Sequence, residues 1–133
     1  MRLMILIVLL AFAPVGADES VYKILTLGEW EGCQGKDRLP LGKDDKNFIH
    51  LAEAHQVEPI ARKFFPHDQR LVIVELDPAQ LPGRLVHESN PGGTALYYHL
   101  YQGYLPFSAV RSHRTLDNSS SRLSPSWGPE ARL

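Results

Sequence analysis

Leu71-Val72-Ile73-Val74-Glu75-Leu76 is the stretch that decides the fold of this chain. It is almost entirely apolar and rich in β-branched residues, which favours a β-strand over a helix. Its apolar residues fall on both sides of a strand, so we expect both faces to be covered. We therefore predict that residues 71–76 form a central strand of a sheet.

Five other short stretches are rich in β-branched or aromatic residues and are bounded by turn residues. We predict strands at 21–25, 47–51, 85–88, 95–101 and 109–116. Glu53–Phe65 instead has helical periodicity, with one buried face formed by Val57, Ile60, Ala61 and Phe64. About six short strands with one main helix predict a compact α+β domain with a mostly antiparallel or mixed sheet.

Three local patterns lie between these elements. Thr26 and Glu29 have the spacing of a capping box, which predicts a short helical turn that ends at Gly32. The charged run at 43–46 is interpreted as a solvated loop. Residues 77–80 predict a turn with one helical turn.

The first residues have the pattern of a signal peptide. Arg2 is followed by the apolar stretch Leu3–Phe12, and small residues at 14–17 predict cleavage before Asp18. The apolar stretch is shorter than the ~20 residues that a membrane span needs. We therefore predict that residues 1–17 are a signal peptide and that the mature protein is periplasmic or secreted, without a stable membrane span.

Removal of the first 17 of 133 residues leaves 116, enough for one domain, predicted at 18–116. Residues 117–133 are rich in Ser, Arg and Pro and predict a disordered tail. Cys33 is the only cysteine, so no disulfide forms within the chain, and in an oxidising compartment it is a free thiol or forms an intermolecular bridge. We expect a structural role for it and not a catalytic one. Without Arg2, 13 basic and 15 acidic residues give a net charge of −2, which disfavours binding to duplex nucleic acid. The oligomeric state stays open.

Two histidines lie inside apolar strand patterns. Alternation along 47–51 puts Phe48 and His50 on one face, and alternation along 95–101 puts Tyr97, His99 and Tyr101 on one face. If the two strands are neighbours, His50 and His99 look into one aromatic-walled cleft suited to a small ligand. The alternative is that each imidazole is a core residue bonded to a backbone carbonyl.

Other polar residues near the predicted strands are Lys23, Glu88 and Arg111. Glu88 can orient a histidine or bind a sugar hydroxyl, or it can form a salt bridge at the rim. His50 and His55 are five residues apart, which does not fit the zinc motif H-E-x-x-H, and we predict no metal site. No serine-hydrolase elbow or phosphate-binding loop is present in the sequence.

Several short segments together resemble the DUF952 family of small, mostly bacterial proteins of unknown function. They run in order from Val21 to Leu116: Val21-Tyr22-Lys23-Ile24 with Glu29-Trp30, Phe48-Ile49-His50-Leu51, Gln56, 71–77, 85–88, and His99-Leu100-Tyr101 with Leu105-Pro106. The resemblance implies a split sheet of the ADP-ribosyltransferase-like kind, with NAD or an ADP-ribose-like ligand between the sheets. It implies catalytic roles for His50 and His99. The candidate ligand-binding residues beside them are Lys23, Tyr97, Tyr101 and Glu88.

Three positions depart from the usual pattern of that family. Lys23 stands in place of a histidine, Ala52 in place of a serine, and Gln102-Gly103-Tyr104 adds length before Leu105. A lysine can contact a phosphate but cannot replace an imidazole that orients a ribose hydroxyl. We therefore favour an exported domain that binds a small anionic or nucleotide-like ligand. The alternatives are an active ADP-ribosyltransferase-like enzyme that uses NAD and a non-catalytic structural or interaction domain.

Overall fold

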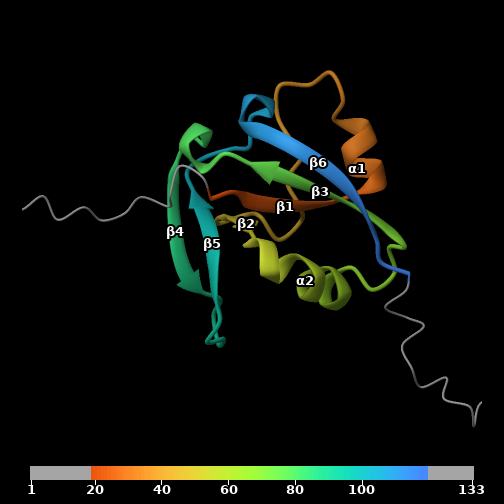
Figure 1. The fold of residues 1–133 in the computed structure, drawn as a ribbon. Helices are drawn as coiled ribbons and strands as arrows, with labels where there is room; N and C mark the ends of the chain where they lie inside the picture. Colours follow the sequence, from red (N-terminus) through yellow and green to blue (C-terminus); the bar gives the residue numbers. More distant parts are fainter. Residues whose placement is uncertain (1–18, 120–133) are drawn as a thin grey trace, which may run out of the picture.

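The computed structural model describes residues 19–119 and contains two three-stranded antiparallel sheets (Figure 1). One sheet has the order β1-β3-β6 and the other has the order β2-β5-β4. The strands are β1 (Val21–Thr26), β2 (Ile49–Leu51), β3 (Arg70–Leu76), β4 (Arg84–Ser89), β5 (Leu96–Tyr101) and β6 (Val110–Asp117). The helices are α1 (Leu27–Gly32) and the main helix α2 (Val57–Phe64). The predicted α+β domain with six short strands and one main helix is confirmed.

The apolar strand β3 lies between β1 and β6, which confirms that it is central. Its side chains alternate between two hydrophobic cores on opposite faces of the sheet. Val72, Val74 and Leu76 enter the larger core, while Leu71 and Ile73 enter the smaller one. Both faces of β3 are therefore covered, as its continuous apolar run predicts.

Different elements cover the two faces. The larger core includes apolar residues from the second sheet, among them Ile49, Leu51 and Leu100. The smaller core lies under α2, which contributes Val57 and Ala61. Figure 1 shows α2 along one face of the first sheet and β4 and β5 running across its end. The first sheet is thus the middle layer of the molecule.

The two sheets are joined at one isolated bridge. The Tyr22 N–H donates to the Ala52 carbonyl and the Ala52 N–H donates to the Tyr22 carbonyl, each over 2.9 Å. This bridge places the start of β1 beside the end of β2. The expected split sheet therefore takes the form of two sheets that diverge from this contact.

The capping box predicted before α1 is confirmed. The Glu29 N–H donates to the Thr26 hydroxyl oxygen over 3.1 Å, and the Thr26 N–H donates to the Glu29 carboxylate over 2.9 Å. Asp77 likewise caps the single turn at Pro78–Gln80, where a helical turn was predicted. Both turns form because a side-chain oxygen satisfies an otherwise free backbone N–H.

The main helix is shorter than predicted, and one residue of its expected buried face is exposed. Residues 54–56 form a 3₁₀ turn, and α2 proper begins at Val57. Phe64 is 61% exposed, which corrects the prediction, and Phe65 packs against the smaller core instead. The helix ends at Phe64, and Phe65, which packs against the smaller core, follows it with a non-helical backbone (φ −126°, ψ 49°).

The turn after β5 requires glycine. Gln102 adopts a left-handed conformation with φ 52°, and Gly103 then passes close to Pro82. A Cβ on Gly103 would lie 1.9 Å from the Pro82 carbonyl oxygen. This contact holds the entry of β4 against the exit of β5.

We expect Gly103→Ala to lower the free energy of unfolding by about 1–3 kcal/mol or more, because the backbone must shift to admit a methyl group. Gly28→Ala in α1 is the matched control, since a Cβ there meets nothing within 4 Å. Alanine favours a helix over glycine, so the control is neutral or stabilising by about 0.5–1 kcal/mol. Urea denaturation of both variants measures the difference, and equal stabilities would contradict the steric argument.

Candidate functional site

The pairing of β2 with β5 brings the two predicted histidines together. His50 and His99 are direct partners in the register, and their ring centroids are 5.5 Å apart. Ile49 and Leu51 point to the opposite side, into the larger core. The condition set for a shared site, that these two strands are neighbours, is therefore met.

His50 is held by Asp45. Its Nδ1 lies 2.9 Å from Asp45 Oδ1, and its backbone N–H donates to the same oxygen over 2.9 Å. A carboxylate only accepts, so Nδ1 carries the hydrogen and Nε2 is the second functional nitrogen of the ring. The His50 side chain is 41% exposed, which leaves this ring open to a ligand.

Asp45 is buried, although the sequence placed it in a solvated loop. Its side chain is only 3% exposed, and it accepts from Lys23 Nζ over 2.6 Å and from the Gly42 N–H over 2.8 Å. Burial opposes ionisation of Asp45, but the hydrogen bonds from His50 and the charge of Lys23 outweigh it and hold the pKa well below its usual range. The carboxylate is therefore an ionised acceptor at the base of the site.

Lys23 lies beneath the site and not on its surface. The side chain is buried on the face of β1 that also carries Val21 and Leu25. Besides its ion pair with Asp45, its Nζ donates to the His50 carbonyl oxygen over 3.2 Å. The predicted phosphate-contacting lysine is thus already engaged in the protein, and contact with a ligand stays a prediction.

His99 is enclosed. Its side chain is 1% exposed, with Nδ1 2.9 Å from Glu88 Oε1 and Nε2 3.0 Å from Asn90 Oδ1. The Phe48 ring stacks on it, with centroids 4.0 Å apart. Both nitrogens and one ring face are occupied, so His99 positions its neighbours and reaches a ligand only if they move.

Glu88 connects His99 to Tyr101. The Tyr101 hydroxyl donates a short hydrogen bond to Glu88 Oε1, the same oxygen that lies beside His99. The hydrogen bonds from Tyr101 and then from His99 lower the pKa of Glu88. The same hydrogen bond to Glu88 raises the pKa of Tyr101. Of the three roles considered for Glu88, orientation of a histidine is the one that this geometry fits.

Tyr97 lies outside the hydrogen-bond network of the two histidines, and neither of the two hollows in the described residues corresponds to the predicted cleft. Tyr97 pairs with Glu88 across β4 and β5, but within residues 19–119 its side chain forms no hydrogen bond or ring contact. Phe48 covers His99, and two hollows in the described residues, one beside Arg114 and one beside Cys33, include neither histidine. The open part of the candidate site is therefore the His50 ring.

Two partners in this site were missed from the sequence. Asp45 differs from its exposed neighbour Asp44 only in its place in the loop, and no pattern separates the two. Asn90 lies in a stretch that reads as a hairpin loop. Asp45 and Asn90 can be recognised as partners in the site only in the folded structure, where β1, β2 and β5 lie together.

Other features of residues 19–119 bear on the class of protein. No three His, Cys, Asp or Glu side chains in this part of the chain gather into a group that could hold a metal ion. None of the helices described there has the length and apolar character of a membrane span. Cys33 is buried, and burial raises the pKa of its thiol.

The fold and the segments around both histidines define an α+β domain of a known sequence family. The chain belongs to the DUF952 family, described as a protein of unknown function, whose model matches residues 24–113. The resemblance drawn from the sequence is confirmed. A comparison with curated proteins finds no match.

Solved structures of one bacterial protein are similar to this chain. The crystal structure of protein CC0527 from Caulobacter crescentus is 32% identical, with a TM-score of 0.62, over 74% of this chain and 86% of that one. The solution NMR structure of CC0527 is 31% identical, with a TM-score of 0.59, over 74% of this chain and 84% of that one. The relation to ADP-ribosyltransferases stays a prediction.

Predictions about the two ends fall almost wholly outside the described residues. The predicted signal peptide at 1–17 lies outside them, as does all but the first part of the predicted tail at 117–133. Residue 117 still belongs to β6, and the Asn118 side chain donates to the Phe65 carbonyl oxygen over 2.9 Å. Residues 117 and 118 are therefore part of the described fold.

We expect Asp45→Asn to lower the free energy of unfolding by about 3 kcal/mol or more, because it leaves the buried Lys23 without its counter-ion. Asp44→Asn removes the same charge at an exposed position and is the control. Chemical denaturation at pH 7 compares them. Lys23→Met combined with Asp45→Asn recovers part of the loss, because no buried cation is then left unpaired.

The same ion pair predicts a pH dependence of stability. The folded-state pKa of Asp45 lies below its unfolded value of about 3.9. The stabilisation from Asp45 is therefore fully present above about pH 5 and is lost as the pH falls. Denaturation between pH 7 and pH 3 gives a shallower acid loss for Asp45→Asn than for Asp44→Asn, and identical slopes would contradict this assignment.

Proposed function

We propose that this protein binds a small anionic or nucleotide-like ligand at His50. The observation that carries the proposal is the fixed imidazole: Asp45 holds Nδ1 over 2.9 Å while the side chain stays 41% exposed. An orienting carboxylate on one nitrogen fixes the tautomer and aims the other nitrogen outward. Such a ring is already arranged for a ligand, so less conformational freedom is lost on binding.

The chemistry of His50 Nε2 suits ligands that carry both hydroxyl and phosphate groups. In the neutral imidazole with hydrogen on Nδ1, Nε2 accepts a hydrogen bond from a hydroxyl. In the protonated imidazole it donates to an anionic oxygen, which gives a stronger, charge-assisted bond. Sugar phosphates and nucleotides offer both partners within a few ångströms.

The charges around His50 are compatible with an anion. The negative charge of Asp45 is balanced by Lys23 Nζ at 2.6 Å, so it does not act alone on a ligand. The Arg84 guanidinium lies 5.0 Å from the Tyr101 ring centroid and adds a positive charge near the edge of the site. Phe48, with its ring centroid 4.8 Å from that of His50, adds apolar surface.

His99 supports this site from below in our proposal. It holds Glu88 and Asn90 and carries the stacked Phe48 ring, which in turn lies beside His50. We therefore assign His99 a positioning role. The ligand contacts proposed for Glu88 and Tyr101 would need their mutual hydrogen bond to open.

An enzyme of the ADP-ribosyl transfer type is the second candidate. The favouring observation is again the pair of Asp45 and His50, because a carboxylate-held imidazole is also the arrangement of a general base. In that case His50 would contact the ribose of NAD, an acceptor nucleophile such as water would form a new bond to that ribose, and nicotinamide would leave. The family resemblance, and not the site alone, brings NAD into consideration.

We also propose that the domain acts after export, in the periplasm or outside the cell. The support is the pattern of residues 1–17, with one positive charge, an apolar stretch and small residues before Asp18. Intact mass measurement of the protein recovered from the periplasm or medium checks this. A mature protein that begins at Asp18 is expected, and a mass that retains Met1–Ala17 overturns the proposal.

We expect NAD, ADP-ribose or a nucleoside cyclic phosphate to shift the NMR signals of the His50 ring. His50→Ala lowers the affinity about tenfold or more, because a hydrogen bond to a charged group is lost. His55→Ala is the control, since His55 is a highly exposed histidine close in sequence and outside the site. Nicotinamide release from NAD, lost in His50→Ala, distinguishes the enzyme from a binding domain.

Two results would count against ligand binding at His50. The absence of any shift at His50 with all three compounds favours a purely structural or interaction domain. Equal affinities of the His50→Ala and His55→Ala variants place the ligand elsewhere on the molecule. Urea denaturation of both variants ensures that a lost signal does not reflect a lost fold.

A further inference from the structure

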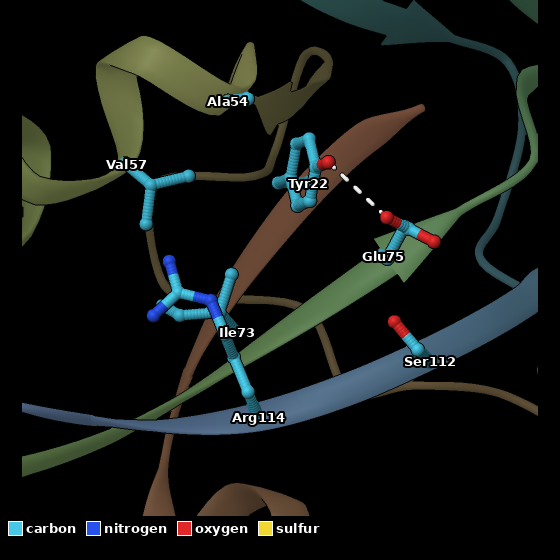
Figure 2. Close-up of a pocket in the computed structure, with 7 residues that line it drawn as sticks. All are labelled: Tyr22, Ala54, Val57, Ile73, Glu75, Ser112 and Arg114. Carbon is cyan, nitrogen blue, oxygen red and sulfur yellow. Dashed lines mark hydrogen bonds between the residues drawn. The ribbon is translucent and has the colours of Figure 1, made fainter. Parts of the chain in front are cut away.

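A hollow of about 150 Å³ lies on the opposite face of the first sheet, beside the start of α2 (Figure 2). Its apolar surface comes from Ala54, Val57 and Ile73. Its polar surface comes from Tyr22, Glu75, Ser112 and Arg114. None of these residues belongs to the network around His50.

The strand register explains how these side chains meet. Tyr22 pairs with Glu75, and Glu75 pairs with Ser112, so the three form one row across β1, β3 and β6. The next row on the same face consists of Ile24, Ile73 and Arg114. Ile24 and Ile73 are buried in the core under α2, whereas the first row lies at the edge of the helix. A polar row thus borders an apolar floor.

Glu75 is the unusual member of this row. It interrupts the apolar run of β3, and packing of the smaller core does not require a carboxylate there. The Tyr22 hydroxyl donates to Glu75 Oε2 over 3.2 Å. Burial, then the hydrogen bond and charge of Glu75, raises the pKa of Tyr22, so the phenol stays a donor near neutral pH. One oxygen of Glu75 is thus fixed, and the other is available to a ligand.

The positively charged side chain that borders the hollow, Arg114, lies at the end opposite Glu75. Figure 2 shows the Arg114 side chain reaching past Ile73 toward Val57, while Glu75 and Ser112 lie on the far side of the opening. Within residues 19–119 Arg114 forms no hydrogen bond or ion pair. A guanidinium without a partner and a carboxylate therefore border one small space without pairing with each other.

We infer that this hollow is a second ligand site, which takes a small zwitterion of the α-amino-acid class. The guanidinium of Arg114 would bind the ligand carboxylate, and Glu75 would bind the ligand ammonium group, with Ser112 beside it. A cavity of this size holds about six non-hydrogen atoms, by comparison with cavities that admit benzene. Alanine and serine have this size and carry both charges.

The site would be independent of His50. Tyr22 and Lys23 are consecutive in β1 and point to opposite faces of the sheet, one to the hollow and one to the Asp45 network. Loss of the His50 site should therefore leave amino-acid binding unchanged. The two proposals can fail separately.

The test is an NMR titration of the full chain with L-alanine and L-serine, compared with propionate, which lacks the ammonium group, and ethylamine, which lacks the carboxylate. We expect shifts of the Tyr22, Val57 and Arg114 amides with the amino acids and shifts about tenfold weaker or less with the other two compounds. Arg114→Gln and Glu75→Gln each lower the affinity for alanine about tenfold or more. Arg70→Gln is the control, because Arg70 is an exposed arginine of the same sheet outside the hollow.

Three outcomes would overturn the inference. Equal binding of alanine and propionate, with Glu75→Gln having no effect, shows that the hollow selects only an anion. The hollow is likewise a site for anions alone if inorganic phosphate binds tightly and binds more tightly to Glu75→Gln. No shift at the hollow with alanine or serine at any concentration removes the site. If either charge variant fails to fold, Ser112→Ala, a small change at the edge of the hollow, takes its place in the titration.

Discussion

The buried ion pair between Lys23 and Asp45 is the interaction on which the arrangement of the candidate site depends. Asp45 accepts from Lys23 Nζ, from the Gly42 N–H, and from both the backbone N–H and the ring of His50. Ions leave water at a high cost unless their charges and hydrogen bonds are well matched. Here one carboxylate satisfies four donors, so the loop before β2 has a defined position against β1. This position of the loop also determines the orientation of the His50 ring.

Stability alone does not account for this pair. Lys23 stands between Val21 and Leu25 on a face that is otherwise packed with apolar side chains, and an apolar residue there would avoid the desolvation of a charge. What the ion pair provides is orientation, because an apolar contact would not distinguish one ring position of His50 from another. A second polar group, formed by His99, Glu88 and Tyr101, fixes the other strand of the site in the same way.

The parts of this structure that the sequence predicts are those with a local physical signal. The apolar run of β3, the capping box of Thr26 and the alternation around His50 each act over a few residues, and each appears as expected. Asp45 has no such signal, since what distinguishes it from Asp44 is a set of contacts with Lys23, Gly42 and His50 that exists only in the folded chain. Phe64 shows a case in which a local signal is present but misleading. Its position fits the helical periodicity, but the backbone turn at Phe65 decides which of the two rings is buried.

The first strand connects the two faces of the molecule. Its residues alternate, so Lys23 supports the histidine network while Tyr22 and its partner Glu75 border the hollow beside α2. The same strand is joined to the second sheet through the backbone of Tyr22 and Ala52. A shift of β1 by one residue would move Lys23 to the α2 face and Tyr22 into the larger core, and both polar groups would lose their partners. The polar residues of β1 therefore fix the register that the apolar residues alone would specify less sharply.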